Sequence, residues 1–378
     1  MVYLDHNAST PTDPRVVEEM LPHLAQNFGN PSSIHSAGRA ARAALDDARE
    51  RFAAVLGARA HEIIFTSGGT EACNLAVLGI ARAHAHRGRH IVTAATEHHA
   101  ILHTCEHLAH NEGFEVTFLP VDRFGRIDPG MFDAALRKDT ILATLMHANN
   151  ETGTIHPIRE IGALCRERGV FFHTDAVQSF GKEPLETGWV DAASFAAHKF
   201  YGPKGIGALW LRAGIALARS AHGGSHENSR RPGTENPAGA AGLAMAGELA
   251  LAEMDATRER IAPMARRLAD ELPGAWPGAF RNGDPEHGLV NTVNFCFPGA
   301  DGEALLIGLD LEGVAASSGS ACMVGSLQAS HVLLAMGVPG PLAACAVRFS
   351  LGRGTRDGDI AAAVDAVRRL HSRLTANP

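Results

Sequence analysis

The sequence predicts an α/β fold: a large domain built on a mostly parallel sheet, followed by a smaller C-terminal α+β domain. Between residues 61 and 211, short apolar segments of strand length alternate with segments of helical periodicity, which is the pattern of a parallel sheet covered by helices. Polar residues follow directly after several of these apolar segments. Beyond residue 211 the alternation loosens, and strand-like segments resume from about residue 289.

The composition is that of an ordinary globular protein. The 378 residues are 45% hydrophobic and 20% charged, and the formal net charge of −7 argues against nucleic-acid binding. The chain starts without a basic flank or an apolar core segment, so we expect no secretory signal. The longest apolar run, 238–252, is interrupted by glycines and by Glu248, and predicts a buried small-residue helix, not a membrane span. Six scattered cysteines without a C-x-x-C pair predict reduced thiols and a cytoplasmic protein.

The first part of the chain supplies the elements of the large domain. A helix is expected from about residue 12 to 24, capped by Thr12 or Asp13, with Pro14 in its first turn. Short apolar segments predict strands at 61–66, 90–94, 114–119, 140–146, 170–174 and on both sides of a Gly/Pro turn between 191 and 211. Helical periodicity predicts helices at about 38–56, from the 67–71 turn to 86, and at about 100–111, 129–136 and 158–168.

The second part of the chain supplies the smaller domain. An alanine-rich helix is expected to continue to about residue 268. Further strands are expected at 292–297, 314–316 and 346–350, and further helices at 302–309, 330–336 and from 357. With a boundary near residue 256, the large domain comprises residues 12–255, and the small domain comprises 1–11 and 256–378.

A lysine stands at the end of an apolar strand in the stretch 191–211. Lys199 follows His198 and precedes a Gly/Pro turn. Burial of an ammonium group is costly, and it is tolerated where a depressed amine pKa is useful, as in Schiff-base chemistry. A surface lysine at a hairpin is the alternative, and this stretch alone does not decide between the two.

A glycine-rich turn, Ser67-Gly-Gly-Thr70, separates the first strand of the sheet from the following helix. Free main-chain N–H groups at the positive end of a helix dipole suit a phosphate. The turn is neither a Walker loop nor a dinucleotide fingerprint, so Ser67, Gly69 and Thr70 are candidates for holding a single phosphate ester. A plain strand-to-helix loop capped by Thr70 is the alternative.

Several predicted strands end in polar groups of complementary chemistry. Because ligands of such sheets lie beyond the carboxyl ends of the strands, these groups are expected on one rim. They are Ser67–Thr70, Glu97–His99, His147–Glu151, Asp175–Gln178 and His198–Lys199.

Nine motifs follow one another along nearly the whole chain. They are YLDHNASTP, TSGGTEACNLA, TEHHA, HANNETG, HTDAVQSFGK, SFAAHKFYGPKGIGAL, RRPGTEN, SSGSACMVGSLQASHVL and VRFSLGR. Together they resemble the motifs of the pyridoxal-phosphate-dependent cysteine desulfurases of the NifS/IscS type, within the class V aminotransferase group. The resemblance implies fold type I with a seven-stranded sheet, pyridoxal 5'-phosphate as cofactor and L-cysteine as substrate.

The resemblance assigns cofactor-binding roles to residues of these motifs. Lys199 would form the Schiff base with the cofactor and later move the Cα proton. Asp175 would keep the pyridine nitrogen protonated, and His98 would stack on the ring and act as an acid or base. The other implied cofactor contacts are Gly69, Thr70 and His198 at the phosphate, Gln178 and Asn150 at the ring hydroxyl, and Thr234 from the neighbouring subunit of a homodimer.

The remaining implied roles concern the substrate and the sulfur. Arg348, with Asn7 beside it, would bind the substrate carboxylate. Cys322 lies in a small, polar segment and would accept sulfur as a persulfide, releasing alanine, before passing it to an acceptor or iron–sulfur scaffold protein. The chain departs from the family pattern at Ala196, where many relatives carry a phosphate-binding serine, and at His6.

Two rival interpretations stay open at this point. His99, His103 and His107 recur on one face of a predicted helix with a spacing that suits zinc, although we expect no resident metal and at most a transient iron–sulfur cluster at Cys322. The other rival keeps the cofactor but changes the reaction to that of a selenocysteine lyase or an aminotransferase. Cys322 discriminates, since a transaminase needs no loop cysteine.

Overall fold

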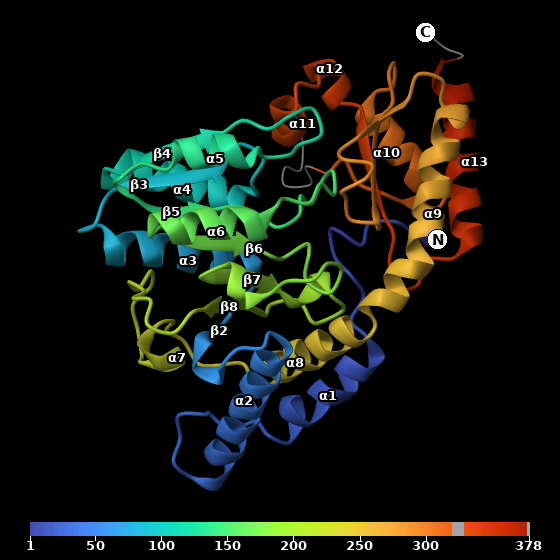
Figure 1. Ribbon diagram of the computed structural model, residues 1–378. Helices are drawn as coiled ribbons and strands as arrows, with labels where there is room; N and C mark the ends of the chain where they lie inside the picture. Colours follow the sequence, from blue (N-terminus) through green and yellow to red (C-terminus); the bar gives the residue numbers. More distant parts are fainter. Residues whose placement is uncertain (320–328, 376–378) are drawn as a thin grey trace.

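A seven-stranded sheet forms the centre of the protein in a computed structural model that describes residues 1–319 and 329–375 (Figure 1). The strands lie in the order β2-β8-β7-β6-β5-β3-β4. β8 is antiparallel to both of its neighbours, and the other neighbouring pairs are parallel. The predicted mostly parallel sheet is thus confirmed. The strands are β2 (Ile63–Thr66), β3 (His90–Ala94), β4 (Glu115–Leu119), β5 (Thr140–Thr144), β6 (Phe171–Asp175), β7 (Ala192–Ala196) and β8 (Gly207–Leu211).

Helices bury both faces of this sheet, which is why its inner strands are continuous apolar runs. On one face, the sheet packs against α3 (Gly69–His84) and α4 (His99–Glu112) through residues such as Ile91 and Leu209. On the other face, the aromatic side chains of Phe52, Phe172 and Phe195 pack in a larger core. The helices of that face include α2 (Ser36–Val55), α5 (Pro129–Ala135), α6 (Ile158–Arg168) and α8 (Pro237–Ala252).

A smaller unit lies beside the carboxyl ends of the parallel strands (Figure 1). It contains an antiparallel sheet, β12-β10-β9, and a two-stranded parallel pair, β1-β11, through which the N-terminal residues join the C-terminal part. Its core is centred on Trp276, Phe295 and Phe349. The elements are β1 (Val2–Tyr3), β9 (Phe280–Asn282), β10 (Thr292–Cys296), β11 (Val314–Ala315), β12 (Ala346–Ser350), α9 (Met254–Ala275), α10 (Gly302–Leu311), α11 (His331–Ala335), α12 (Gly340–Ala343) and α13 (Asp357–Thr375).

The predicted alanine-rich helix is two helices, α8 and α9, so that expectation was wrong. The break falls at Glu253, whose carboxylate pairs with Arg15 at 2.7 Å and with Arg353 at 3.2 Å. Small residues let α8 pack closely, because a Cβ at Gly247 would stand 3.1 Å from the ring of Phe52. The domain boundary expected near residue 256 therefore lies within the first turn of α9.

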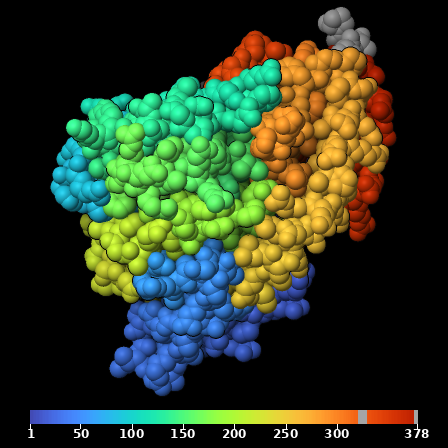
Figure 2. Space-filling view, in the orientation of Figure 1, coloured from blue at the N-terminus to red at the C-terminus, as the bar shows by residue number. Residues whose placement is uncertain are grey.

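The N-terminal helices project from the body of the molecule (Figure 2). α1 (Pro14–Ala25), capped by the side chain of Asp13, and the following loop carry apolar side chains that are exposed, including Leu24, Phe28 and Ile34. The remaining short elements are α7 (His226–Ser229) and the 3-10 turns η1 (Ala60–Glu62), η2 (Thr187–Trp189) and η3 (Ala197–Lys199). In the described part of the chain, no helix combines the length and apolarity needed to cross a membrane.

Candidate active site

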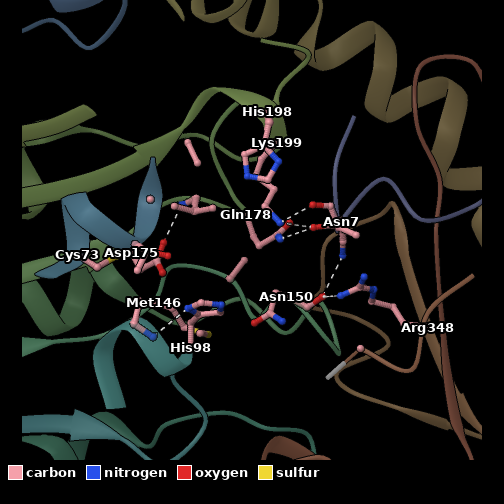
Figure 3. A pocket seen from close by; sticks show the side chains of 18 residues that line it. Asn7, Cys73, His98, Met146, Asn150, Asp175, Gln178, His198, Lys199 and Arg348 are labelled. Carbon is pink, nitrogen blue, oxygen red and sulfur yellow. Dashed lines mark hydrogen bonds between the residues drawn. The ribbon is translucent and has the colours of Figure 1, made fainter. Parts of the chain in front are cut away.

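A pocket of about 260 Å³ opens where the carboxyl ends of the parallel strands face the smaller unit (Figure 3). The segments that reach it include the turn before α3, the start of α4, the loops after β5 and β6, η3, β12 and the N-terminal segment. Ten predicted site residues line this pocket, Ser67 and Thr234 do not, and Cys322 is outside the described residues. Those in the pocket wall are Asn7, Gly69, Thr70, His98, Asn150, Asp175, Gln178, His198, Lys199 and Arg348.

Asp175 is the last residue of β6 and lies at the base of the pocket with 7% of its surface exposed. Its Oδ1 accepts a hydrogen bond from the N–H of Val177 at 2.9 Å, which fixes the carboxylate at the strand end. Burial raises the pKa of Asp175, whereas His98 and Lys199 act in the opposite direction. Among the described residues no ion pair is formed by this carboxylate. A cationic N–H group placed in the pocket would therefore be strongly favoured beside it.

His98 is held as the N-cap of α4. Its Nδ1 accepts a hydrogen bond from the N–H of Ala100 at 3.1 Å, so the neutral ring carries its proton on Nε2. Burial lowers the pKa of His98, which keeps the ring neutral, while Asp175 pulls the pKa upward. Beneath this turn the buried Glu97 accepts a hydrogen bond from the N–H of Met146 at 2.7 Å. The imidazole is thus a fixed, neutral group on the wall of the pocket (Figure 3).

The N-terminus of α3 forms the end of the pocket suited to an anion. Gly69 begins this 16-residue helix, and a Cβ at Gly69 would stand 2.7 Å from Cγ2 of Val177 and 3.3 Å from Cβ of Ala196. Only glycine lets the main chain approach so closely there. Thr70 and His198 flank the same end, and burial followed by the charges of Lys199 and Lys204 lowers the pKa of His198 to about 4.

The amine of Lys199 points toward the N-terminal segment. Nζ donates to the main-chain oxygen of Asn7 at 2.7 Å and to that of Ala8 at 3.0 Å. Gln178 Nε2 donates to the same Asn7 oxygen at 2.9 Å. Figure 3 shows Lys199, Gln178 and Asn7 together on one side of the pocket, with Asp175 and His98 on the other.

Arg348 enters the pocket from β12 and is almost fully buried. One Nη donates to the carboxylate of Asp5 at 2.7 Å, and the other donates to the main-chain oxygen of Asn150 at 2.9 Å. Its buried Nε has no hydrogen-bond partner among the described residues. Asn7 Nδ2 donates to Thr292 Oγ1 at 2.9 Å and to the same oxygen of Asn150 at 3.2 Å. Arg348 and Asn7 thus both donate to the main-chain oxygen of Asn150.

Thr234 is exposed and outside the pocket, although its loop is tied to the start of α3 by an ion pair between Arg231 and Glu71 at 2.8 Å. Cys322 lies outside the described residues. The other five cysteines are buried, and burial raises the pKa of each thiol, including that of Cys296 to about 11. Such thiols are poor nucleophiles.

The structure does not assemble the zinc site of the rival interpretation. The ring of His99 lies 4.7 Å from that of His103 and 4.6 Å from that of His331, while His107 bonds to Glu112 at 3.2 Å instead. Within residues 1–319 and 329–375, no group of three or more His, Cys, Asp or Glu side chains is arranged to hold a metal ion.

Three residues at the site received no role in the sequence analysis. Cys73 lines the pocket below Asp175, Asp5 holds Arg348, and Lys182 donates to the side chains of Gln178 and Asn7. Lys182 stands inside a quoted motif, HTDAVQSFGK, and is one of only four lysines in the chain. The small number of lysines in the chain was the sequence signal that could have drawn attention to Lys182. No sequence signal pairs Asp5 with Arg348.

Comparison with known proteins identifies the class. The family model described as aminotransferase class-V matches residues 2–362, so the chain belongs to this family. Within it, the chain is 48% identical to the cysteine desulfurase IscS of Dictyoglomus turgidum, over 99% of this chain and 95% of that relative. A solved NifS-like protein superposes with a TM-score of 0.92 at 35% identity, covering 98% of this chain and 99% of that one. A second solved structure, SspA in complex with cysteine, covers 93% of this chain and 99% of its own, with a TM-score of 0.82 at 35% identity.

The predicted resemblance is thereby confirmed, and the protein is an enzyme of the cysteine desulfurase group with pyridoxal 5'-phosphate as its cofactor. The pocket fits this cofactor. Its base holds a buried carboxylate suited to a protonated ring nitrogen, and the glycine cradle at α3 leaves main-chain N–H groups open to a phosphate. The amine of Lys199 lies in the same wall, in reach of a carbonyl carbon for a Schiff base.

Proposed function

We propose that this pocket removes sulfur from L-cysteine and passes it, as a persulfide on Cys322, to an acceptor protein, leaving L-alanine. The observation that carries the proposal is the convergence of three groups on one pocket: the Lys199 amine, the buried Asp175 carboxylate and the Arg348 guanidinium. The relatives named as cysteine desulfurases and the neighbour solved with cysteine support the choice of substrate.

Each residue of the pocket has a defined task in this proposal. Pyridoxal 5'-phosphate, when bound, supplies an electron sink for the carbanion at Cα. Asp175 keeps the ring nitrogen protonated, and Lys199 anchors the cofactor and moves the Cα proton. Arg348 binds the substrate carboxylate, with Asn7 beside it. The remaining contacts are Gly69, Thr70 and His198 at the phosphate, Gln178 and Asn150 at the ring, and His98 at its face.

The sulfur step conserves atoms and electrons. The thiolate of Cys322 attacks the sulfur of the bound cysteine, an S–S bond forms and the C–S bond breaks. The electron pair of that bond stays on Cβ, which takes a proton and becomes the methyl group of alanine. Sulfur is oxidised and carbon is reduced, so no external oxidant is needed.

The proposal includes a homodimer of two-domain subunits. Thr234 is exposed on a tethered loop, which supports its contact with the pocket of a second subunit, and the exposed apolar side chains of Leu24, Phe28 and Ile34 support a covered N-terminal surface. Residues 12–255 form one domain, and 1–11 with 256–378 form the other. A cytoplasmic location would keep the Cys322 thiol reduced. The acceptor is an iron–sulfur scaffold or another sulfur-accepting protein.

The proposal is tested by incubating the purified enzyme with L-cysteine and measuring alanine, sulfide and the mass of the peptide that contains Cys322. We expect alanine, and a peptide heavier by one sulfur atom. Cys322→Ala should keep the cofactor and lose sulfide release, whereas Cys345→Ala, a buried control, should keep both. Sulfide release at the wild-type rate by Cys322→Ala would contradict the persulfide step. Transfer of the amino group to a keto acid by that variant, without alanine formation, would favour an aminotransferase.

A further inference from the structure

Lysine is scarce in this chain and gathers near the site. It occurs only at positions 138, 182, 199 and 204, while arginine supplies the other permanent positive charges. The last three lie between β6 and β8. Lysine, unlike arginine, releases its proton readily when it is buried or surrounded by positive charge. Lys182 therefore brings a second ionisable amine to the neighbourhood of Lys199.

Both amines contact Asn7, one through its side chain and the other through its main chain. Lys182 Nζ donates to Oε1 of Gln178 at 3.1 Å and lies 3.4 Å from Oδ1 of Asn7. Lys199 Nζ donates to the main-chain oxygen of Asn7, and so does Gln178 through its Nε2. Lys182 and Lys199 also line one cavity of about 40 Å³, and Lys199 lines the main pocket as well. Asn7 thus links the two amines, and Gln178 bonds both to Lys182 and to Asn7.

The groups that face the Lys182 amine are mostly positive. Burial, followed by the charges of Lys199 from η3 and Arg348 from β12, lowers the pKa of Lys182 to about 7. His6 of the N-terminal segment is also affected, since burial and then Lys182 lower its pKa to about 4.

The carboxylates of Asp5 and Glu183 are engaged by arginines. Asp5 pairs with Arg348 at 2.7 Å, and Glu183 pairs with Arg258 of α9 at 2.8 Å. No ion pair involves Lys182 among the described residues. The charge of Lys182 is therefore left to act on Lys199.

Lys199 faces other ionisable groups on its pocket side. Asp175 lies there, together with the rings of His98 and His198, and both imidazoles have lowered pKa values, chiefly through burial. Asp175 is the one carboxylate of this set, and it favours a proton on Lys199. A bound cofactor with a protonated ring nitrogen would pair with Asp175, and the positive charge from the Lys182 side would then be the larger influence on Lys199.

We propose that Lys182 is a positioning residue for the reaction of the proposed function, on which this inference rests. It holds the side chains of Asn7 and Gln178 beside the Asn7 main-chain oxygen to which Lys199 donates, and when Lys182 is protonated its positive charge favours the unprotonated form of the Lys199 nitrogen. The chemistry requires this form, because an amine accepts the Cα proton only when it is not already protonated, and an ordinary lysine is protonated at neutral pH.

The test is a pH titration of the visible absorption band of the cofactor–Lys199 Schiff base in the purified holoenzyme. Lys182→Gln keeps hydrogen-bond donors for Asn7 and Gln178 but removes the charge, and it should raise the titration midpoint by about one pH unit. Lys182→Arg carries the positive charge at every pH of the titration and should leave the midpoint at or below that of the wild type. Lys138→Gln, at an exposed position on the loop after α5, is the control and should leave it unchanged.

Two results would overturn the inference: an unchanged midpoint in Lys182→Gln, or a rise in Lys182→Arg as large as that in Lys182→Gln. If Lys182→Gln does not hold the cofactor, Lys182→Met provides the same readout and should raise the midpoint at least as far. The proposed function fails separately. It fails if Lys199→Ala keeps the covalent absorption band, whereas the Lys182 comparison uses only proteins in which Lys199 is intact.

Discussion

The two walls of the pocket are built in different ways. The sheet wall uses neighbours in sequence: Asp175 ends β6, His98 caps α4 and Gly69 begins α3, each within a few residues of a strand end. The opposite wall joins distant segments, since Arg348 contacts Asp5 across 343 positions. The sheet wall therefore follows from the fold itself, whereas the opposite wall forms only once the N-terminal segment and β12 have come together.

This difference separates two tasks. The sheet wall presents a fixed carboxylate, a fixed neutral imidazole and a helix N-terminus, which suit the cofactor. The opposite wall presents a guanidinium and two amides, to which the Lys182 amine is hydrogen-bonded, and this network suits the substrate and the Lys199 nitrogen. Substitutions in the first wall should act on kcat, and those in the second on KM or on pH dependence.

The largest effect is expected where the two walls meet, at Lys199. Lys199→Ala should lower the rate of alanine formation by about a thousandfold or more, because both the covalent anchor and the proton-moving amine are lost. The visible band should disappear with it. Lys138→Ala is the matched control and should behave as the wild type. An active Lys199→Ala would show that another group moves the proton.

The next largest effect is expected in the sheet wall. Asp175→Asn keeps the shape but removes the charge beside the ring nitrogen, and kcat should fall about a hundredfold with little change in KM for cysteine. Steady-state kinetics at saturating cofactor measure both constants. A kcat within a few-fold of the wild type would mean that the charge of this wall is not used.

A smaller effect is expected in the opposite wall. Arg348→Lys keeps a positive charge but loses the planar fork that binds Asp5, Asn150 and a carboxylate together, so KM should rise about tenfold with kcat nearly unchanged. Arg356→Lys, on the exposed segment that follows β12, is the control. Equal KM values for Arg348→Lys and the wild type would remove Arg348 from the substrate site.

The same contrast explains what the sequence could predict. The limits of β3, β12 and α6 were predicted to the residue, because each is an apolar or periodic run with clear flanks. Residues at strand ends were found by the same local logic. The network of Asn7, by contrast, joins side chains that no local pattern relates, so Asp5 and Lys182 received no role. The break between α8 and α9 was missed for the same reason, because Arg15 and Arg353 hold Glu253 from afar.

The smallest effect concerns stability and belongs to the sheet wall. His173 lies buried beneath Asp175, with Nδ1 2.8 Å from Thr144 Oγ1 and Nε2 2.9 Å from Ser194 Oγ. Burial lowers the pKa of His173 to about 3. In the unfolded chain His173 takes up a proton below about pH 6.5, whereas in the folded chain it does not. The contribution of His173 to the unfolding free energy is therefore fully present above about pH 6.5 and is lost as the pH falls toward 3.

The slope of the unfolding free energy against pH reports the number of protons taken up on unfolding. His173→Gln should therefore lower this number by about one below about pH 6.5. Urea titrations at several pH values measure this slope, with His110→Gln on the exposed side of α4 as the control. A slope equal to that of the wild type would show that His173 is already protonated in the folded sheet.

The most direct test of the account is a single-turnover reaction with L-cysteine in which alanine and the mass of the Cys322 peptide are measured together. If both walls serve one reaction, one alanine forms for each peptide that gains one sulfur atom. Alanine without the added sulfur on Cys322, or added sulfur on one of the buried cysteines instead, would contradict the account.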